Sequence, residues 1–119
     1  NMPTEGALDR DGGSLEYLRL HDMTMQAWSP FQYGDWEGAF IGNEKFKPLN
    51  TALDEMAEKY HLTPTGVAAA WIFRHPANIQ LIAGTTKISR MKEIIAAADV
   101  RISREAWYRL YLEAGHRLP

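Results

Sequence analysis

The sequence predicts an α/β fold in which helices outnumber strands. Two mostly apolar runs, at residues 23–28 and 79–83, have the length and composition of short strands, and the first is expected to be buried on both faces. Between and after them, apolar residues recur at helical spacing, and such alternation is typical of a parallel sheet covered by helices. Two strands cannot close a barrel, and a barrel of eight strand-helix units needs about 250 residues. In 119 residues, either helices do most of the packing or the chain is part of a larger fold.

The first third of the chain contains few periodic segments. Residues 1–13 are polar and turn-prone, and Leu15 and Leu18 then predict a short helix that ends near His21. The first strand stops at a Ser-Pro pair. Residues 31–47 are rich in glycine and aromatic residues without a steady period, which predicts a long loop, and long loops in compact domains are often functional.

Two helices are then clearly marked. Pro48 begins the first, which ends at residues 61–62. Thr63 followed by Pro64 is typical of an N-cap and first helical position, and the next helix stays apolar to residue 73, so we expect it to be buried. The apolar positions of the first helix are Leu49, Leu53, Met56, Ala57 and Tyr60.

The last third of the chain repeats the order strand, turn, helix. A turn at residues 84–86 leads into a helix at residues 88–98, and Ser103 is expected to cap a final helix that ends near Gly115. The predicted buried positions of the first of these helices are Met91, Ile94, Ile95 and Ala98. The second helix carries the apolar residues Trp107, Leu110, Tyr111 and Ala114.

Composition excludes several classes of protein. The chain is 45% hydrophobic and 24% charged, as expected of one small folded unit, and its net charge of -2 with scattered Lys and Arg argues against binding nucleic acid. It has no cysteine, which rules out disulfides and Cys-based zinc sites and is compatible with a reducing cytoplasm. No apolar run approaches the roughly 18 residues of a membrane span, and residues 1–6 do not resemble a signal peptide. We therefore expect a soluble cytoplasmic protein without membrane contact.

Residues 26–34 form a candidate ligand-binding segment. A strand here would deliver Trp28, Ser29 and a turn to one place, where the indole face can stack on a flat heterocycle. The Ser29 hydroxyl and the backbone N–H groups after Pro30 can reach phosphate oxygens. The alternative is that Trp28 belongs to the core and that the Ser-Pro pair is an ordinary turn.

Residues 82–93 form a second candidate, in which a strand passes through a turn of small residues into a helix. Helix N-terminal amides attract phosphate, Gly84 allows close backbone approach, and Lys87 and Arg90 can add charge-assisted hydrogen bonds. The alternative is an ordinary capped helix with solvated Lys87, Arg90 and Lys92. Together, the two segments favour nucleotide binding.

The two segments also carry a family resemblance. Residues 27–31 (Ala-Trp-Ser-Pro-Phe) and 82–87 (Ile-Ala-Gly-Thr-Thr-Lys), with Arg90 and Glu93, resemble the last two barrel strands of aldo-keto reductases, and the resemblance runs from about Ser14 to the C-terminus. It implies a (β/α)₈ TIM barrel that reduces aldehydes or ketones by hydride transfer from NADPH, or runs the reverse reaction. Residues 1–119 would be the C-terminal, NADP-binding segment of that barrel, with two short parallel strands and no second domain.

The resemblance assigns roles to residues of both segments. Trp28 matches the aromatic residue that stacks on nicotinamide, and Ser29 and Phe31 match the turn that meets the pyrophosphate. In the second segment, the family surrounds the adenosine 2′-phosphate with a turn and an arginine and places an acid near adenine. The matching residues here are Gly84, Thr85, Thr86, Arg90 and Glu93.

Two positions depart from the family pattern. Ile94 stands where many members have an asparagine that contacts adenine, and Gly84 stands where some have a phosphate-binding lysine. Both departures weaken the case for NADP over NAD. Lys87 is the residue expected to compensate, so it is included among the cofactor-binding candidates.

No catalytic residue is assigned within this chain. The resemblance implies that the catalytic Asp, Tyr, Lys and His come from earlier strands, so the chain alone is expected to be inactive. We interpret Tyr33, Tyr60, Lys59 and His21 as surface or core residues. Substrate choice would depend mainly on other loops, while Tyr33, Trp36 and Phe40 would weakly favour apolar carbonyls.

Metal sites are not predicted. Residues 9–12 (Asp-Arg-Asp-Gly) resemble the start of a calcium loop, but the twelfth position counted from Asp9 is Leu20, where a bidentate Glu is required. His61 and His75 fall on different helices without a partner at metal-ligand spacing.

A different class of protein remains open. In this alternative, the chain is not part of a reductase but a non-catalytic α/β interaction module whose exposed strand edges pair in a homodimer.

Overall fold

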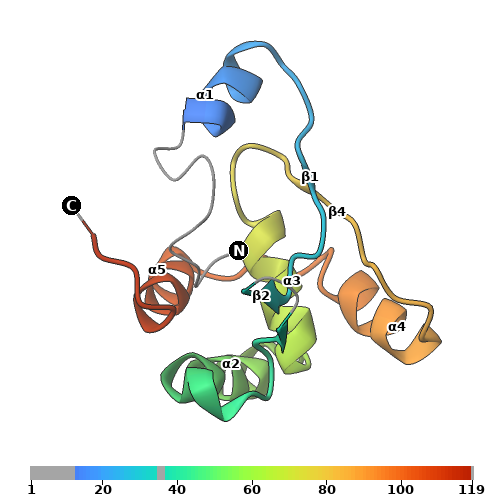
Figure 1. Ribbon diagram of the computed structural model, residues 1–119, viewed down its shortest axis with the longest axis vertical. Helices are drawn as coiled ribbons and strands as arrows, with labels where there is room; N and C mark the ends of the chain where they lie inside the picture. The colour runs from blue at the N-terminus through green and yellow to red at the C-terminus, as the bar shows by residue number, and fades with distance from the viewer. Residues whose placement is uncertain (1–12, 35–36, 119) are drawn as a thin grey trace.

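The computed structural model describes residues 13–34 and 37–118, and Figure 1 shows their arrangement. The helices are α1 (Gly13–Leu20), the 3-10 turn η1 (Glu44–Phe46), α2 (Lys47–Tyr60), α3 (Pro64–Phe73), α4 (Ile88–Ala96) and α5 (Arg104–Glu113). The strands are β1 (Gln26–Ala27), β2 (Gln32–Tyr33), β3 (Gly38–Ala39) and β4 (Gln80–Leu81). Residues 9–12 and Trp36, which entered the predictions above, lie outside the described residues.

Strands β1 and β4 pair in parallel, as the sequence predicts, although they are 54 residues apart along the chain (Figure 1). Gln26 pairs with Gln80 and Ala27 with Leu81, and the Gln26 Nε2 donates to the Gln80 Oε1 at 2.7 Å. The predicted burial is wrong, because none of residues 23–28 is buried. The physical reason is that the described residues supply no third strand to this ladder, so both of its outer edges lack a strand neighbour.

The segment predicted as a long loop is partly regular. Strands β2 and β3 form an antiparallel hairpin, and η1 follows it. Phe40 is 1% exposed, and its ring contacts that of Phe31 edge to face at a centroid distance of 6.5 Å. The hairpin was not predicted because two-residue strands are too short to give an alternating pattern.

Helices α2 and α3 begin and end close to the predicted positions. Helix α2 ends at His61, which adopts the left-handed conformation (φ 54°) of a helix C-cap. Helix α3 begins at Thr63, whose hydroxyl accepts a hydrogen bond from the Gly66 N–H at 3.1 Å, with Pro64 in the first turn. The burial predicted for α3 is confirmed, because most of its residues, including Val67 and Ala69, are buried.

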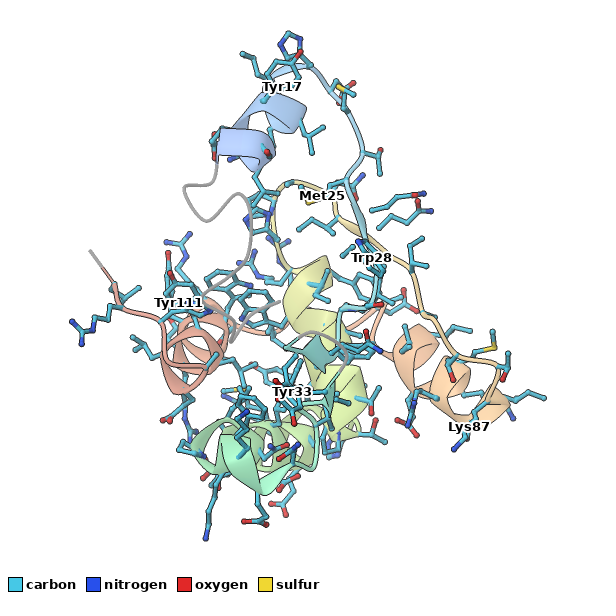
Figure 2. The ribbon with its side chains drawn as sticks, in the orientation of Figure 1. Tyr17, Met25, Trp28, Tyr33, Lys87 and Tyr111 are labelled. Carbon is cyan, nitrogen blue, oxygen red and sulfur yellow. The ribbon has the colours of Figure 1, made fainter. Side chains whose placement is uncertain are left out.

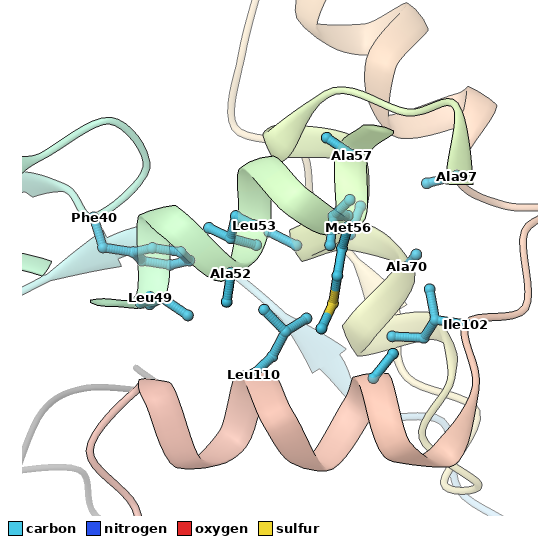
Figure 3. Close-up of a cluster of buried hydrophobic side chains, with 14 of the residues drawn as sticks. Phe40, Leu49, Ala52, Leu53, Met56, Ala57, Ala70, Ala97, Ile102 and Leu110 are labelled. Atoms are coloured by element: carbon cyan, nitrogen blue, oxygen red, sulfur yellow. The ribbon is translucent and has the colours of Figure 1, made fainter. Parts of the chain in front are cut away.

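The core lies between α2, α3 and α5 (Figure 3). Small residues on α3 bring its backbone close to α2, whose Leu49, Leu53, Met56 and Ala57 are buried as predicted. From the α5 side, Ile102 and Leu110 complete the core. These buried apolar side chains, each worth about 1.5–3 kcal/mol when large, provide the main stabilising free energy of the fold.

Helix α5 is fixed to α3 by a pair of indoles. The rings of Trp71 and Trp107 stack at a centroid distance of 4.5 Å with their planes 8° apart. Each indole N–H donates to the other residue's backbone carbonyl at 3.0 Å. At its start, α5 is capped by Ser103 as predicted, since the Ser103 Oγ accepts from the Ala106 N–H at 3.1 Å.

Helix α4 is less buried than the sequence predicts. Ile94 is buried, but Met91 and Ile95 are 41% and 69% exposed, and Ala98 is also exposed. The helix ends at Ala96, and the alanine that faces the core is Ala97. The prediction fails because α4 packs against α3 on one side only, and no described segment covers its other apolar side.

Helix α1 has no buried residue. No helix among residues 13–34 and 37–118 is both long and apolar enough to cross a membrane.

Candidate cofactor-binding site

The two segments singled out in the sequence meet at the strand pair. Because β1 and β4 are parallel, their carboxyl ends lie at the same edge, and Trp28 follows one strand while Ile82 follows the other. The Ile82 N–H donates to the Ala27 carbonyl at 2.9 Å, which extends the pairing to this edge. In parallel sheets, this is the edge where ligands bind.

Trp28 is not a core residue. Its side chain is 67% exposed, so the alternative that it serves packing is wrong for this structure. Figure 2 shows Trp28 beside the β1 and β4 ladder. The face of an exposed indole is suited to stacking on a planar group.

The turn after Trp28 is set by Ser29, which has a left-handed backbone with φ 47°. This conformation is unusual for a non-glycine residue. The Ser29 carbonyl accepts from the Gln32 N–H at 3.1 Å, which closes the turn. Phe31 is partly buried and packs against the core. Of the three candidates here, Trp28 has the most accessible side chain.

The second segment places cations at the start of α4. Gly84 has φ 57° and lies in the left-handed region, so a side chain there would be strained, although an added Cβ would make only an ordinary contact with the Ile82 carbonyl oxygen at 3.9 Å. The Thr85 Oγ1 accepts from the Lys87 N–H at 3.2 Å and fixes the approach to the helix. Lys87, the N-cap residue, makes no side-chain cap hydrogen bond.

Thr86, Lys87 and Arg90 are all exposed. Within residues 13–34 and 37–118, no carboxylate lies within ion-pair distance of Lys87 or Arg90. Two cations without a carboxylate partner at a helix N-terminus are suited to binding an anion. Figure 2 shows Lys87 at the start of α4, apart from Trp28 in this view, so the candidates form two groups rather than one cluster.

Glu93 makes a contact between helices that the sequence does not predict. Its carboxylate accepts a hydrogen bond from the Thr63 hydroxyl at 3.1 Å, and the same hydroxyl caps α3. A Cβ added to Gly66 would lie 3.2 Å from the Glu93 carbonyl oxygen, so the two helices touch closely here. Glu93 therefore links α4 to α3, and no sequence spacing relates residues 63 and 93.

The residues interpreted above as surface or core residues rather than catalytic ones, Tyr33, Tyr60, Lys59 and His21, have structural contacts. The Asn43 Nδ2 donates to the Tyr33 hydroxyl at 3.2 Å, and the Tyr60 hydroxyl accepts from the Ser103 N–H at 3.0 Å. Burial raises the pKa of Tyr60, but the hydrogen bonds with Ser103 and the positive charge of Lys59 outweigh it and lower the pKa below the usual value. The His21 ring lies against Tyr17, 4.3 Å between centroids.

The two histidines weighed as metal ligands also have backbone roles. His61 caps α2, and the His75 Nδ1 accepts from the Ala77 N–H at 3.1 Å. The described part of the chain contains no group of three or more His, Asp or Glu side chains arranged for a metal ion.

Comparison with known proteins gives a consistent family. The family model described as "Aldo/keto reductase family" matches residues 8–111. A 6-dehydroglucose reductase of Agrobacterium fabrum is 33% identical over 100 residues, covering 83% of this chain and 32% of that protein. A 6-dehydroglucose reductase of Novosphingobium aromaticivorans is 33% identical over 110 residues, covering 92% of this chain and 36% of that protein.

A solved structure supports the same family. A thermostable aldo-keto reductase crystallised with the inhibitor epalrestat superimposes with a TM-score of 0.69 at 25% identity, over 88% of this chain and 34% of that one. This chain thus spans about a third of the length of these relatives. The match confirms the predicted α/β barrel fold class. With a family model over most of its length, this chain belongs to the aldo/keto reductase family.

Proposed function

We propose that this chain is the cofactor-holding part of an NADP(H)-dependent aldo-keto reductase. The observation that carries the proposal is the exposed Trp28 ring at the same strand edge as the segment leading to Lys87 and Arg90. NADPH, when bound, would supply the hydride that reduces an aldehyde or ketone. Family membership supports the reaction class, and the residues below are our proposal for how the cofactor is held.

The residues present fit the parts of such a cofactor. The Trp28 face would contact the nicotinamide ring, and the Ser29 hydroxyl with the backbone of the following turn would contact the pyrophosphate. Lys87 and Arg90, with the hydroxyls of Thr85 and Thr86, would contact the 2′-phosphate. Gly84 would shape the turn that brings these groups together.

Glu93 would have to change partners to contact adenine. Its carboxylate is bonded to the Thr63 hydroxyl, so a contact with the adenine amino group would have to share or replace that bond. We therefore propose a smaller contribution to cofactor affinity from Glu93 than from Arg90.

The proposed substrate is a small carbonyl compound. Phe40 is buried and the Tyr33 hydroxyl is hydrogen-bonded to Asn43, so neither supports the expectation of an apolar carbonyl. The two relatives named 6-dehydroglucose reductase make an oxidised sugar the first class to test. We assign catalysis to residues outside this chain and propose that the chain alone binds cofactor without turnover. A cytoplasmic location, without nucleic acid or membrane partners, remains part of this proposal.

Calorimetric titration of the chain with NADPH and NADH tests the proposal. We expect NADPH to bind more tightly, and Arg90→Gln to weaken NADPH binding about tenfold or more through loss of a charge-assisted bond to the 2′-phosphate, with little effect on NADH. Arg117→Gln, an exposed arginine near the C-terminus, is the matched control. Absence of NADPH binding to a folded chain, or equal effects of the two substitutions, would overturn the proposal.

A second candidate is the non-catalytic module that dimerises through strand edges. The observation that favours it is the two-stranded β1 and β4 ladder with exposed Met23, Trp28 and Ile82 beside it. Unpaired edges flanked by apolar side chains readily add another strand. A concentration-dependent dimer that does not bind NADPH would favour this candidate over the reductase.

A further inference from the structure

A pocket formed by the end of α3, the segment between α4 and α5 and the start of α5 is lined by cations and aromatic rings. It lies where the end of α3 meets the start of α5 and has a volume of about 550 Å³. None of the candidate cofactor-binding residues lines this pocket, so it is separate from the candidate cofactor site. The lining residues used below are Arg74, His75, Arg101, Arg104, Trp107 and Tyr108.

The charge of this pocket is unbalanced. Three guanidinium groups line it and no acidic side chain does. Across residues 13–34 and 37–118, none of Arg74, Arg101 and Arg104 has a carboxylate within ion-pair distance. An adjoining pocket of about 390 Å³ shares Arg74 and Arg101 and adds Asp99, its one acidic lining residue. Among the described residues, the acidic groups near these cations are Asp99 in the adjoining pocket, Glu105, which is within the influence of the Arg104 charge, and Glu16, which acts on His75. None of them lines the pocket or forms an ion pair with its three arginines.

Two of the polar groups are already oriented. The Arg74 Nε donates to the Ile102 carbonyl at 3.1 Å, which fixes the half-buried guanidinium between α3 and α5. The His75 Nδ1 accepts from the Ala77 N–H, so the neutral ring carries its proton on Nε2. Both groups thus act as donors, and donors are what an anion requires.

The aromatic side of the pocket is rigid. Trp107 stacks with Trp71 and with Tyr111, at 4.5 Å and 5.8 Å between centroids, so two neighbouring rings hold its position. Tyr108 meets the Trp107 ring edge to face at 5.2 Å and is 42% exposed. Tyr108, the more exposed of the two aromatic residues that line the pocket, is the ring that a ligand would contact.

We propose that this pocket binds a phosphate monoester, with the phosphate on the three arginines and an apolar or ring-shaped remainder against Tyr108. Guanidinium groups bind phosphate oxygens in pairs of parallel hydrogen bonds, which makes arginine the favoured residue for this anion. The volume is within the 300–1,000 Å³ range, roughly, of small-molecule sites and much larger than a bare phosphate needs. The site is distinct from the proposed cofactor contacts on α4 and adds a second ligand to the same chain.

The test is calorimetric titration of the 119-residue chain with phenyl phosphate and with inorganic phosphate. We expect phenyl phosphate to bind more tightly, and the double substitution Arg101→Gln with Arg104→Gln to weaken it about tenfold or more. Both arginines are exposed, so the fold should survive, which a thermal melt would verify. Tyr108→Ala should weaken binding of phenyl phosphate and leave that of inorganic phosphate unchanged.

The matched control is Lys87→Gln with Arg90→Gln, which removes the same charge from the other anion-binding candidate. Phenyl phosphate affinity unchanged in this control supports the pocket. The proposal is overturned if wild-type protein does not bind phenyl phosphate, or if the control weakens binding as much as the pocket variant does. Because NADPH binding is measured with separate variants, failure here would leave the proposed cofactor site intact.

Discussion

Asn50 shows how one side chain can hold an irregular segment. Its amide nitrogen donates to three backbone carbonyls, those of Phe40, Asn43 and Phe46, at 2.9–3.1 Å. Its carbonyl oxygen accepts from the Gly42 N–H at 2.7 Å. The segment between β3 and α2 thus has its backbone groups satisfied by a residue of α2, and nothing in the sequence pattern around Asn50 indicates this.

Asn50→Asp should destabilise the chain, because it keeps the accepting oxygen and replaces the donor with an acceptor facing three carbonyls. We expect a loss of about 2 kcal/mol in the free energy of unfolding, measured by urea denaturation. Asn78→Asp is the control, since Asn78 is exposed and has the left-handed φ of 51° that both residue types tolerate. Equal effects of the two substitutions would contradict this role for Asn50.

His75 makes stability depend on pH. Burial and the positive charge of Arg19 lower its pKa below the usual 6.5, while Glu16 opposes them weakly. The unfolded chain therefore binds a proton at higher pH than the folded chain does. This contribution to stability is fully present above pH 6.5 and is lost as pH falls through the lowered folded pKa.

His75→Asn should make the free energy of unfolding less dependent on pH between pH 7 and 5. The asparagine oxygen can still accept the Ala77 N–H, so the loop should keep its shape. Denaturation curves collected at several pH values give the comparison. If wild type and variant lose stability in parallel over this range, His75 is not the responsible group.

At the scale of elements, the sequence predicts where helices begin and end, but it predicts poorly which of their faces are buried. Proline and capping residues mark the starts of α2, α3 and α5, because caps act within one turn of the chain. Burial depends on what covers a face, so Ile95 on α4 was wrongly predicted as buried. The strands at residues 23–28 and 79–83 pair as expected but over two residues each, because strand length depends on neighbours that the described residues do not supply.

The same distinction applies to the site. The sequence singles out Trp28 and the cations at the start of α4 because they are local features of a strand end and a helix end, and their role in binding a cofactor stays a prediction. The sequence does not predict the hydrogen bond between Thr63 and Glu93, because the two residues are 30 positions apart and lie on different helices.

Thr63 connects α3 to α4 through its hydroxyl, so the stability of the chain should be sensitive to its substitution. Thr63→Ala removes both the cap of α3 and the bond to Glu93, so we expect a loss of about 1–2 kcal/mol in the free energy of unfolding. Thr63→Ser keeps the hydroxyl and should restore most of it. Thermal or urea unfolding measures the difference, and an alanine variant as stable as the serine variant would show that the hydroxyl makes no contribution.

At the scale of the whole molecule, one side is well packed and another is open. Helices α2, α3 and α5 enclose the core (Figure 3), whereas apolar side chains beside β1 and β4 and along α4 are exposed. These are Met23, Trp28, Ile82, Ile88, Met91 and Ile95. Exposed apolar surface of this extent is typical of a face that another polypeptide covers, and the matched relatives are about three times as long as this chain.

The open side should make the isolated chain associate as its concentration rises. Ile88→Lys with Ile95→Lys adds two charges to α4, where both isoleucines are 69% exposed, and should lower the apparent mass in light scattering. Leu112→Lys with Leu118→Lys adds the same charges in and after α5 and should have less effect. A chain that stays monomeric at all concentrations would contradict this prediction.

The paired indoles of Trp71 and Trp107 provide an internal reporter of helix docking. Each indole proton is bonded to a carbonyl of the other helix, so neither can exchange with deuterated solvent by that route until α5 separates from α3. If the two helices separate as units, both protons should exchange at the same rate, and that rate measures how often α5 leaves its place. The phosphate pocket is built from the same two helices, so its ligand should slow both exchanges together, and nuclear magnetic resonance could detect occupancy without any signal from the ligand.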